Sequence, residues 1–251
     1  VDIDVSAGNF RFMDYREADV AGVPCMINRI TYSGDLGYEL WMKPVHQRRV
    51  YLGIKQAGAA HGIVDFGMRA LLSMRLEKNF PSWFAELRPI YGPYEASMER
   101  FIKPQKPDFI GRAAAVAERD AGPKLRRVSL IIDAGTADVM ADEPIWARVG
   151  DTDFGTIGTP HEYGARRFDA SGVEQPKPSP SREGDWRVVG WVTSGGYAHF
   201  VRASMAQGYI PAALAENGDA GMFQVEIMGE RRAARIALVP PFDPEGARMR
   251  S

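Results

Sequence analysis

The chain has 251 residues and a formal net charge of -1, and 45% of its residues are hydrophobic and 25% charged, a balance typical of a globular protein with room for one large or two ordinary domains. A nearly neutral chain has no global field that favours nucleic acid or an anionic membrane, and no apolar run approaches the roughly 20 residues needed to span a bilayer. The only cysteine, Cys25, excludes an intrachain disulfide and a multi-cysteine metal site.

Cys25 stands among apolar neighbours, in Gly-Val-Pro-Cys-Met-Ile. We therefore expect a buried, inert thiol and a reducing, cytosol-like compartment. The histidines are scattered without the spacing of metal ligands, so we expect no metal site; they are His46, His61, His161 and His199.

The first predicted strand begins at residue 18 and turns at residues 22–24, and a second strand leads into residues 29–40, Arg-Ile-Thr-Tyr-Ser-Gly-Asp-Leu-Gly-Tyr-Glu-Leu. This stretch has the pattern of strand, tight turn and strand. Such a turn would bring Tyr32 and Glu39 close together, where a phenol face and an acceptor-only carboxylate would form a receptor for a flat heterocycle with adjacent N–H donors. Spacing alone favours a simpler alternative, a surface hairpin with Tyr32 in the core and Glu39 in water.

Two helices are predicted next. Residues 45–61 follow Pro44 and have apolar groups near a helical period, and Gly62 is expected to end this helix. A short, mostly buried helix is expected before residue 77, with Asp65 near its start as a possible cap. Its arginines, Arg69 and Arg75, are expected to have anionic or carbonyl partners, because an unpaired arginine near a core costs several kcal/mol. The simpler alternative is that they reach solvent or form structural pairs with Asp65 or Glu77.

An alanine-rich helix is predicted after Gly111, ending near Arg119. Ala-Gly-Pro at residues 121–123 breaks the pattern, and we place a domain boundary there, giving domains 1–121 and 122–251.

From residue 125 onward, short strands alternate with turns, which predicts a small antiparallel barrel or sandwich. The strands are expected to start near residues 127, 144, 186, 223 and 232, with Gly229 and Glu230 forming a hairpin between the last two. Residues 151–185 are polar and rich in Gly, Pro and Ser, and are expected to be an exposed, partly disordered insertion.

Several of these segments resemble motifs of one family. Residues 32–39 are similar to the Tyr-x-Gly-Glu-x-Gly-x-Glu signature of the aminomethyltransferase (glycine cleavage T-protein) family, with Asp35 where the family has Glu. Residues 67–77 are similar to its Gly-x-x-Ala-Arg-Asp-x-Leu-Arg-Leu-Glu segment, although Leu71 and Leu72 replace the Arg-Asp pair. Arg69 stands in a Gly-x-Arg-Ala arrangement like that of the dimethylglycine and sarcosine dehydrogenase branch. Residues 93–102 are similar to the family's Pro-x-Glu-Ala helix, so the resemblance implies a helix there. Residues 189–195 resemble the family's Val-Gly-x-Val-Thr-Ser-Gly turn. The last residues resemble the terminal run of those dehydrogenases, where Asp243 and Arg248 are expected to pack the tail.

The resemblance implies an α+β fold: the C-terminal part of a T-protein-like folate-binding domain, followed by a small antiparallel β-barrel domain. It implies a tetrahydrofolate-dependent one-carbon (aminomethyl) transfer module, forming 5,10-methylenetetrahydrofolate, within an N-methyl amine dehydrogenase or oxidase of the dimethylglycine or sarcosine type. Tetrahydrofolate would contact Tyr32, Glu39 and Arg69.

The resemblance also implies that the family's catalytic aspartate and an FAD-carrying domain or subunit lie upstream of Val1, so no catalytic residue is assigned in this chain. Two alternatives stay open: a folate-dependent O- or S-demethylase of the same superfamily, and a non-catalytic folate-binding or assembly protein.

Overall fold

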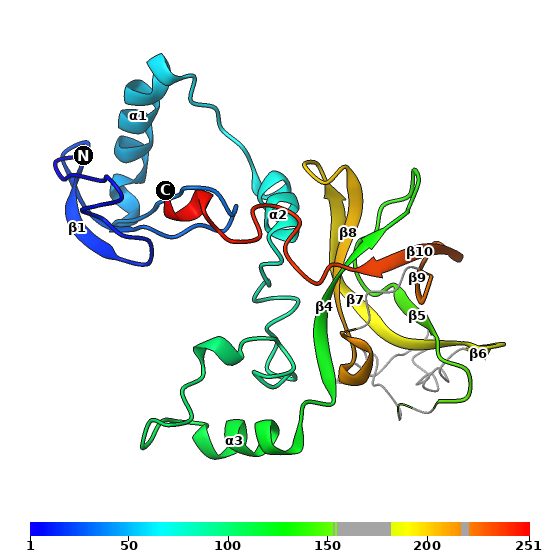
Figure 1. Ribbon diagram of the computed structural model, residues 1–251. Coiled ribbons are helices and arrows are strands. Elements are labelled where there is room, and N and C mark those ends of the chain that lie inside the picture. Colours follow the sequence, from blue (N-terminus) through cyan, green and yellow to red (C-terminus); the bar gives the residue numbers. More distant parts are fainter. Residues whose placement is uncertain (153, 155–181, 217–220) are drawn as a thin grey trace, which may run out of the picture. The chain divides into compact units, whose positions relative to one another are not determined.

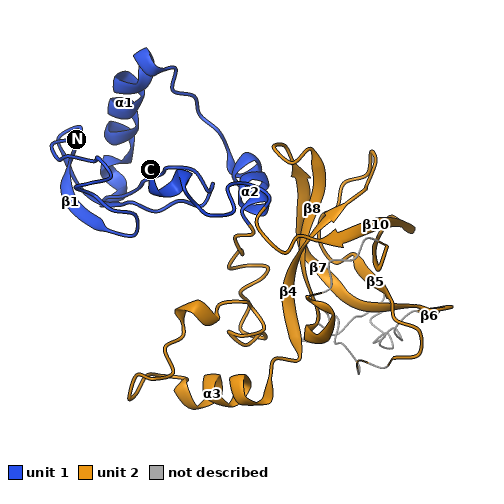
Figure 2. Cartoon of the chain, viewed as in Figure 1, with its two compact units in different colours: residues 1–78, 241–251 blue, residues 79–240 orange. Residues whose placement is uncertain are grey.

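The computed structural model describes residues 1–152, 154, 182–216 and 221–251. They fold into two compact units, coloured separately in Figure 2: unit 1 comprises Val1–Lys78 together with Pro241–Ser251, and unit 2 comprises Asn79–Pro240. Unit 1 is therefore assembled from the two ends of the sequence. The predicted division into 1–121 and 122–251 rests on breaks in the sequence pattern and stays a prediction.

Unit 1 is built on an antiparallel sheet in the order β1-β2-β3 (Figure 1), with β1 at Tyr15–Val20, β2 at Val23–Asn28 and β3 at Glu39–Trp41. The β1–β2 turn lies on Ala21 and Gly22, whose φ values of 54° and 68° fit the primed turns that match strand twist. The predicted first strand thus exists, but it begins at Tyr15 rather than residue 18. One sheet face packs on a small core; its buried members are Phe10, Val20, Val23, Cys25, Ile27 and Val50.

The predicted tight turn within residues 29–40 is wrong. β2 and β3 do pair antiparallel, with Asn28 opposite Glu39, but residues 29–38 form an open loop between them, here called the Tyr32 loop. The loop satisfies its backbone through side chains: the Gly34 N–H donates to Thr31 Oγ1 at 3.2 Å, and the Thr31 and Ser33 hydroxyls lie 3.1 Å apart. Such local hydrogen bonds compete with strand pairing, so the β2–β3 ladder ends at the Asn28–Glu39 pair and is closed by a long loop rather than a tight turn.

The two predicted helices of unit 1 are present. A 3-10 turn at Pro44–His46 leads into α1, Gln47–Gly58, which passes through a second turn at Ala59–His61 and ends at Gly62 in the left-handed conformation, as predicted. The second helix, α2, spans Met68–Glu77 and starts at Gly67 without a side-chain cap.

Two details of α2 correct the prediction. Asp65 does not cap it, because its carboxylate accepts hydrogen bonds from Tyr51 Oη and Lys55 Nζ on α1, both at 3.1 Å. The helix is also buried only at its end: Met68 is 65% exposed, whereas Arg75 is 2% and Lys78, just beyond the helix, 3% exposed.

Unit 2 begins with a run of turns before α3, residues 79–111, here called the lead-in. The helix predicted at residues 93–102 is wrong, because only a 3-10 turn at Glu99–Phe101 forms there, and Ser97 interrupts the segment with a φ of 58°. The alanine-rich helix is confirmed as α3, Arg112–Ala121, after Gly111.

The rest of unit 2 is a closed antiparallel β-barrel, which confirms the predicted fold class. Neighbouring strands follow the order β5-β9-β10-β4-β8-β7, and β7 pairs back with β5 to close the ring, while β6 extends the sheet beside β7 (Figure 1). The strands are β4 Leu125–Ile132, β5 Pro144–Arg148, β6 Arg182–Glu183, β7 Trp186–Ala198, β8 Ala203–Pro211, β9 Phe223–Ile227 and β10 Glu230–Ile236. The predicted β9–β10 hairpin is confirmed, with Met228 and Gly229 at its turn.

The longest strands of the barrel, β7 and β8, depart from the prediction. Residues 189–195, likened to a turn, lie within β7, which bulges between Val192 and Ser194. The strand β8 was not predicted, because almost every residue of it is buried and it lacks apolar-polar alternation. The two strands approach so closely that a Cβ on Gly190 would overlap the Tyr209 carbonyl oxygen.

The barrel encloses the larger hydrophobic core, whose fully buried members include Leu130, Ile145, Val192, Ile210 and Phe223. The predicted polar insertion at 151–185 lies mostly outside the described residues. None of the helices in the described ranges is long and apolar enough to cross a membrane.

Candidate functional site

The Tyr32 loop and β3 carry two of the three predicted site residues. Tyr32 is half-buried in the loop, and Glu39 is the exposed first residue of β3. The structure therefore places both on one continuous stretch of unit 1. The alternative, a surface hairpin with Tyr32 in the core and Glu39 in water, agrees with the exposed Glu39, but Tyr32 is only half-buried.

Glu39 lies on the outer face of the three-stranded sheet. Side chains alternate along a strand, so Glu39 and Trp41 share this face, and the Trp41 indole Nε1 donates to Glu39 Oε2 at 3.4 Å. The strand register puts Tyr15 and Asn28 in line with Glu39, and Met26 beside Trp41. Trp41 and Tyr15 are each 59% exposed, so a carboxylate is set among accessible aromatic surface.

Arg69, the third predicted residue, lies on a different element. It occupies the exposed first turn of α2, whereas Arg75 is buried near the end of that helix. Being exposed, Arg69 can meet an incoming ligand without leaving a buried charge behind.

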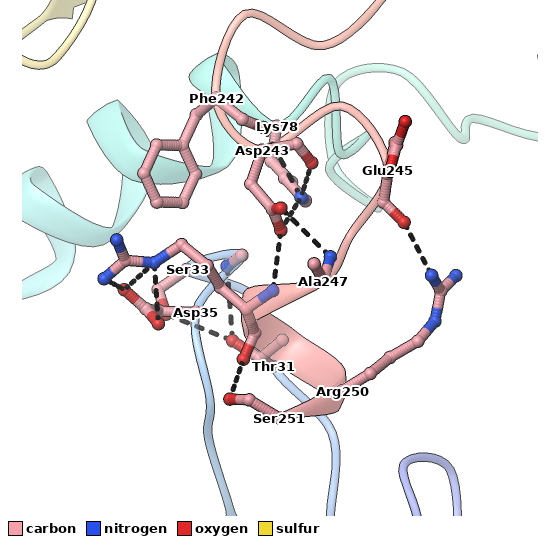
Figure 3. Close-up of polar contacts among 12 residues, drawn as sticks. Thr31, Ser33, Asp35, Lys78, Phe242, Asp243, Glu245, Ala247, Arg250 and Ser251 are labelled. Atoms are coloured by element: carbon pink, nitrogen blue, oxygen red, sulfur yellow. Dashed lines mark hydrogen bonds and ion pairs between the residues drawn. The ribbon is translucent and has the colours of Figure 1, made fainter.

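A segment from the other end of the chain completes this region. Residues 241–251, here called the return segment, run back from β10 into unit 1, where the Phe242 N–H donates to the Glu77 carbonyl oxygen at 3.1 Å. Lys78 Nζ donates to Asp243 Oδ2 at 2.9 Å and also to the carbonyl oxygens of Phe242 and Asp243 (Figure 3). The two side chains of this ion pair are 3% and 11% exposed.

Asp243 also organises the return segment. Its two carboxylate oxygens accept the backbone N–H groups of Ala247, at 3.0 Å, and Arg248, at 3.2 Å. Lys78 and these N–H groups together hold the pKa of Asp243 below its usual value, with the Lys78 hydrogen bond the largest cause. The short turn Arg248–Arg250 thus starts from a carboxylate that stays charged.

Arg248 then reaches the Tyr32 loop. Its Nη2 donates to Asp35 Oδ2 at 2.8 Å, and its Nε lies 3.2 and 3.3 Å from the two Asp35 oxygens. This forked contact lowers the pKa of Asp35 and raises that of Arg248. Arg29, which unlike Arg248 is buried, donates to the carbonyl oxygens of Phe10 and Ser251, so the far end of the return segment is held as well.

Sequence reasoning missed this cluster. Asp35 and Arg248 are 213 residues apart, and Lys78 and Asp243 are 165 apart, so no local spacing connects them. Asp243 and Arg248 were expected to pack the tail, and the structure adds what they pack against. Two features of the sequence could have pointed to this cluster. One is a lysine directly after a helix, and the other is the group of charged residues after the proline pair at 240–241. Among the described residues, no cluster of three or more His, Cys, Asp or Glu could hold a metal ion. Cys25 is buried as predicted, and burial raises the pKa of its thiol.

Comparison with known proteins gives two family matches in chain order. Residues 1–106 match the GCVT N-terminal domain, and residues 126–243 match the glycine cleavage T-protein C-terminal barrel domain. The second match coincides with the closed barrel described above.

The relatives belong to two groups. Mitochondrial dimethylglycine dehydrogenase of Mus musculus is 31% identical over 98% of this chain, and mitochondrial sarcosine dehydrogenase of Mus musculus is 28% identical over 100% of this chain. The chain spans only 24% of the length of each of these relatives. The aminomethyltransferase of Moorella thermoacetica is 27% identical over 94% of the chain, which spans 54% of that enzyme.

A solved structure agrees with the fold. The aminomethyltransferase T of the glycine cleavage system from Bartonella henselae superposes with a TM-score of 0.69 over 94% of this chain and 54% of its own, at 20% identity. Since the two domain models match most of the chain in order, the protein belongs to the glycine cleavage T-protein (aminomethyltransferase) family and is related to the dimethylglycine and sarcosine dehydrogenases.

Proposed function

We propose that this chain is the tetrahydrofolate-dependent one-carbon (aminomethyl) transfer module of an N-methyl amine dehydrogenase of the dimethylglycine or sarcosine type, with 5,10-methylenetetrahydrofolate as product. The observation that carries the proposal is the 31% identity over 98% of the chain to a dimethylglycine dehydrogenase. Oxidation of the amine, with FAD, would belong to another part of the protein or to a partner subunit.

The residues present fit a reduced pterin. A pterin ring is flat and has adjacent N–H donors, so it needs an aromatic surface and a carboxylate acceptor. Glu39 offers an exposed carboxylate, and Trp41 and Tyr15 offer accessible aromatic faces on the same side of the sheet. The Trp41 N–H engages one Glu39 oxygen at 3.4 Å and orients the carboxylate.

Each residue has a role in the proposal. Glu39 accepts the pterin N–H groups, the ring of Tyr32 covers one side of the ligand, and Arg69 supplies a positive charge for a carboxylate of the ligand or of the amine substrate. When bound, tetrahydrofolate supplies the nitrogens that accept the one-carbon unit. The chain itself binds and orients, and the selectivity of Glu39 follows because an analogue without the N–H donors would leave a desolvated carboxylate unpaired.

The proposal is tested by anaerobic calorimetry with tetrahydrofolate on the full chain. We expect binding in the micromolar range, weakened about tenfold or more, or about 1.4 kcal/mol, by Glu39→Gln, Arg69→Ala and Tyr32→Leu. Tyr32→Phe should bind like the unchanged chain if the ring face is what matters.

Matched controls separate the site from general charge effects. Glu216→Gln changes an exposed carboxylate of unit 2, outside the three-stranded sheet, and Arg48→Ala changes another exposed arginine, on α1. Both should keep the original affinity. Equal weakening by the controls, or absence of binding by a demonstrably folded chain, would contradict the proposed site.

A further inference from the structure

The Tyr32 loop is held from both ends of the chain. At its ends, the backbone of Arg29 exchanges hydrogen bonds with Met13 and Asp14, and Tyr38 Oη donates to the Val5 carbonyl oxygen at 2.8 Å. At Asp35, in the middle of the loop, the partner is Arg248 of the return segment. We propose that the return segment is the positioning element of the Tyr32 loop: Lys78 anchors the segment through Asp243, and Arg248 then holds the loop through Asp35. The inference rests on the proposed function in so far as the loop carries a ligand-binding residue, Tyr32.

The anchor is the buried part of this arrangement. Lys78 is 3% exposed, and a buried ammonium is stable only when its donors are satisfied. Asp243 and two carbonyl oxygens of the return segment provide the acceptors. Removing the return segment would therefore leave a buried positive charge without them, so the segment is held firmly at this point.

The contact with the loop is made at the surface. The Asp35 and Arg248 side chains are 45% and 59% exposed, and an isolated pair of this kind contributes little to stability. The forked geometry fixes direction, however, and the Phe242 ring lies 5.3 Å from the Arg248 guanidinium and 5.7 Å from Lys78 Nζ. The Phe242 ring therefore packs against both Lys78 and Arg248, which restricts the directions that the Arg248 side chain can take.

The anchor also touches the loop directly. Gly34 is buried with a φ of 84°, and a Cβ placed there would lie 2.8 Å from Lys78 Cδ. The loop is thus held at Gly34 by the Lys78 stem and at Asp35 by Arg248, on the two residues that follow Ser33. Tyr32 is separated from these points by one residue, so their positions restrict its ring.

The experiment follows amide hydrogen exchange in peptides covering residues 30–38 of the full chain, together with tetrahydrofolate affinity. Arg248→Ala should raise the rate of amide exchange in these peptides and lower the affinity for tetrahydrofolate about fivefold or more. Arg248→Lys should recover much of both, because an ammonium can still pair with Asp35. Arg250→Ala is the control within the return segment, since Arg250 Nη1 donates only to the Glu245 carbonyl oxygen among the described residues, and it should change neither readout.

The outcomes separate the two proposals. Unchanged loop exchange in Arg248→Ala, or equal loosening in Arg250→Ala, would overturn the positioning role. If the unchanged chain bound no tetrahydrofolate, the proposed function would fail, and the exchange comparison would still decide whether the return segment orders the loop.

Discussion

Each unit contains a loop that is held through a carboxylate. The carboxylate is buried in unit 2 and exposed in unit 1. In unit 2, Glu86 of the lead-in is completely buried and accepts hydrogen bonds from Thr193 Oγ1 at 2.6 Å, Ser194 Oγ at 2.5 Å and the Ser82 N–H at 2.7 Å. In unit 1, Asp35 is held by the forked Arg248 contact at the surface.

This difference in burial determines how firmly each loop is fixed in position. A buried carboxylate cannot lose its donors without a large free-energy cost, so the lead-in is fixed to the barrel as part of the fold. An exposed ion pair is screened by salt and released by acid, so the Tyr32 loop is held conditionally. In the function proposed above, the Tyr32 loop admits and releases a ligand, which an exposed ion pair permits more readily than a buried carboxylate would.

The largest effect is expected from breaking the barrel that buries Glu86. Gly190→Ala places a methyl group against the Tyr209 carbonyl oxygen, where backbone has to move. We expect a loss of about 3 kcal/mol or more in the stability of unit 2, measured by urea unfolding. Gly8→Ala, at a glycine with no atom within 4 Å of an added Cβ, is the control. Equal stability of the two variants would show that the β7–β8 contact is not tight.

A smaller effect is expected from Glu86 itself. Glu86→Leu removes the acceptor of the Ser194 hydroxyl and of the Ser82 N–H, and each buried donor left without an acceptor costs about 1–3 kcal/mol. We expect a loss of about 3 kcal/mol in unit 2, and less in Glu86→Gln, which keeps one oxygen. Urea unfolding and amide exchange of residues 79–99 measure both. A Glu86→Leu protein as stable as Glu86→Gln would mean that the hydroxyls find other acceptors.

The sequence could predict one of these two regions far better than the other. Most barrel strands have local alternation and turn residues, and the β9–β10 hairpin follows from Gly229 alone. β8 was missed because burial on nearly every position removes the period of two. The local pattern led to Tyr32 and Glu39 but predicted a tight turn between them, because two partners of residues 29–38 are distant in sequence: Ser251 accepts from Arg29 and Arg248 donates to Asp35. These depend on how the chain returns, which no spacing within a motif encodes.

The smallest effect, and the one that distinguishes the exposed carboxylate, is its response to pH. The hydrogen bonds from Arg248 lower the pKa of Asp35 below its ordinary value of 3.8. The pair therefore contributes its full stabilisation above that value, and loses it as the pH falls through the lower pKa of the folded protein. Arg248 stays charged throughout, and the neighbouring Asp243 carboxylate opposes the shift only weakly.

We expect Arg248→Ala to lower the Tm of unit 1 by on the order of a degree or two at pH 5–7. The difference in Tm between the unchanged chain and Arg248→Ala should disappear as the pH falls below 3.8 and through the lower pKa of the folded protein. At neutral pH the same difference should shrink in high salt. Calorimetric scans from pH 3 to pH 7, with Arg250→Ala as the matched variant, measure this. A gap that persisted unchanged in acid would mean that Arg248 acts through packing on the Phe242 ring, and that the hold on the Tyr32 loop is as permanent as the one at Glu86.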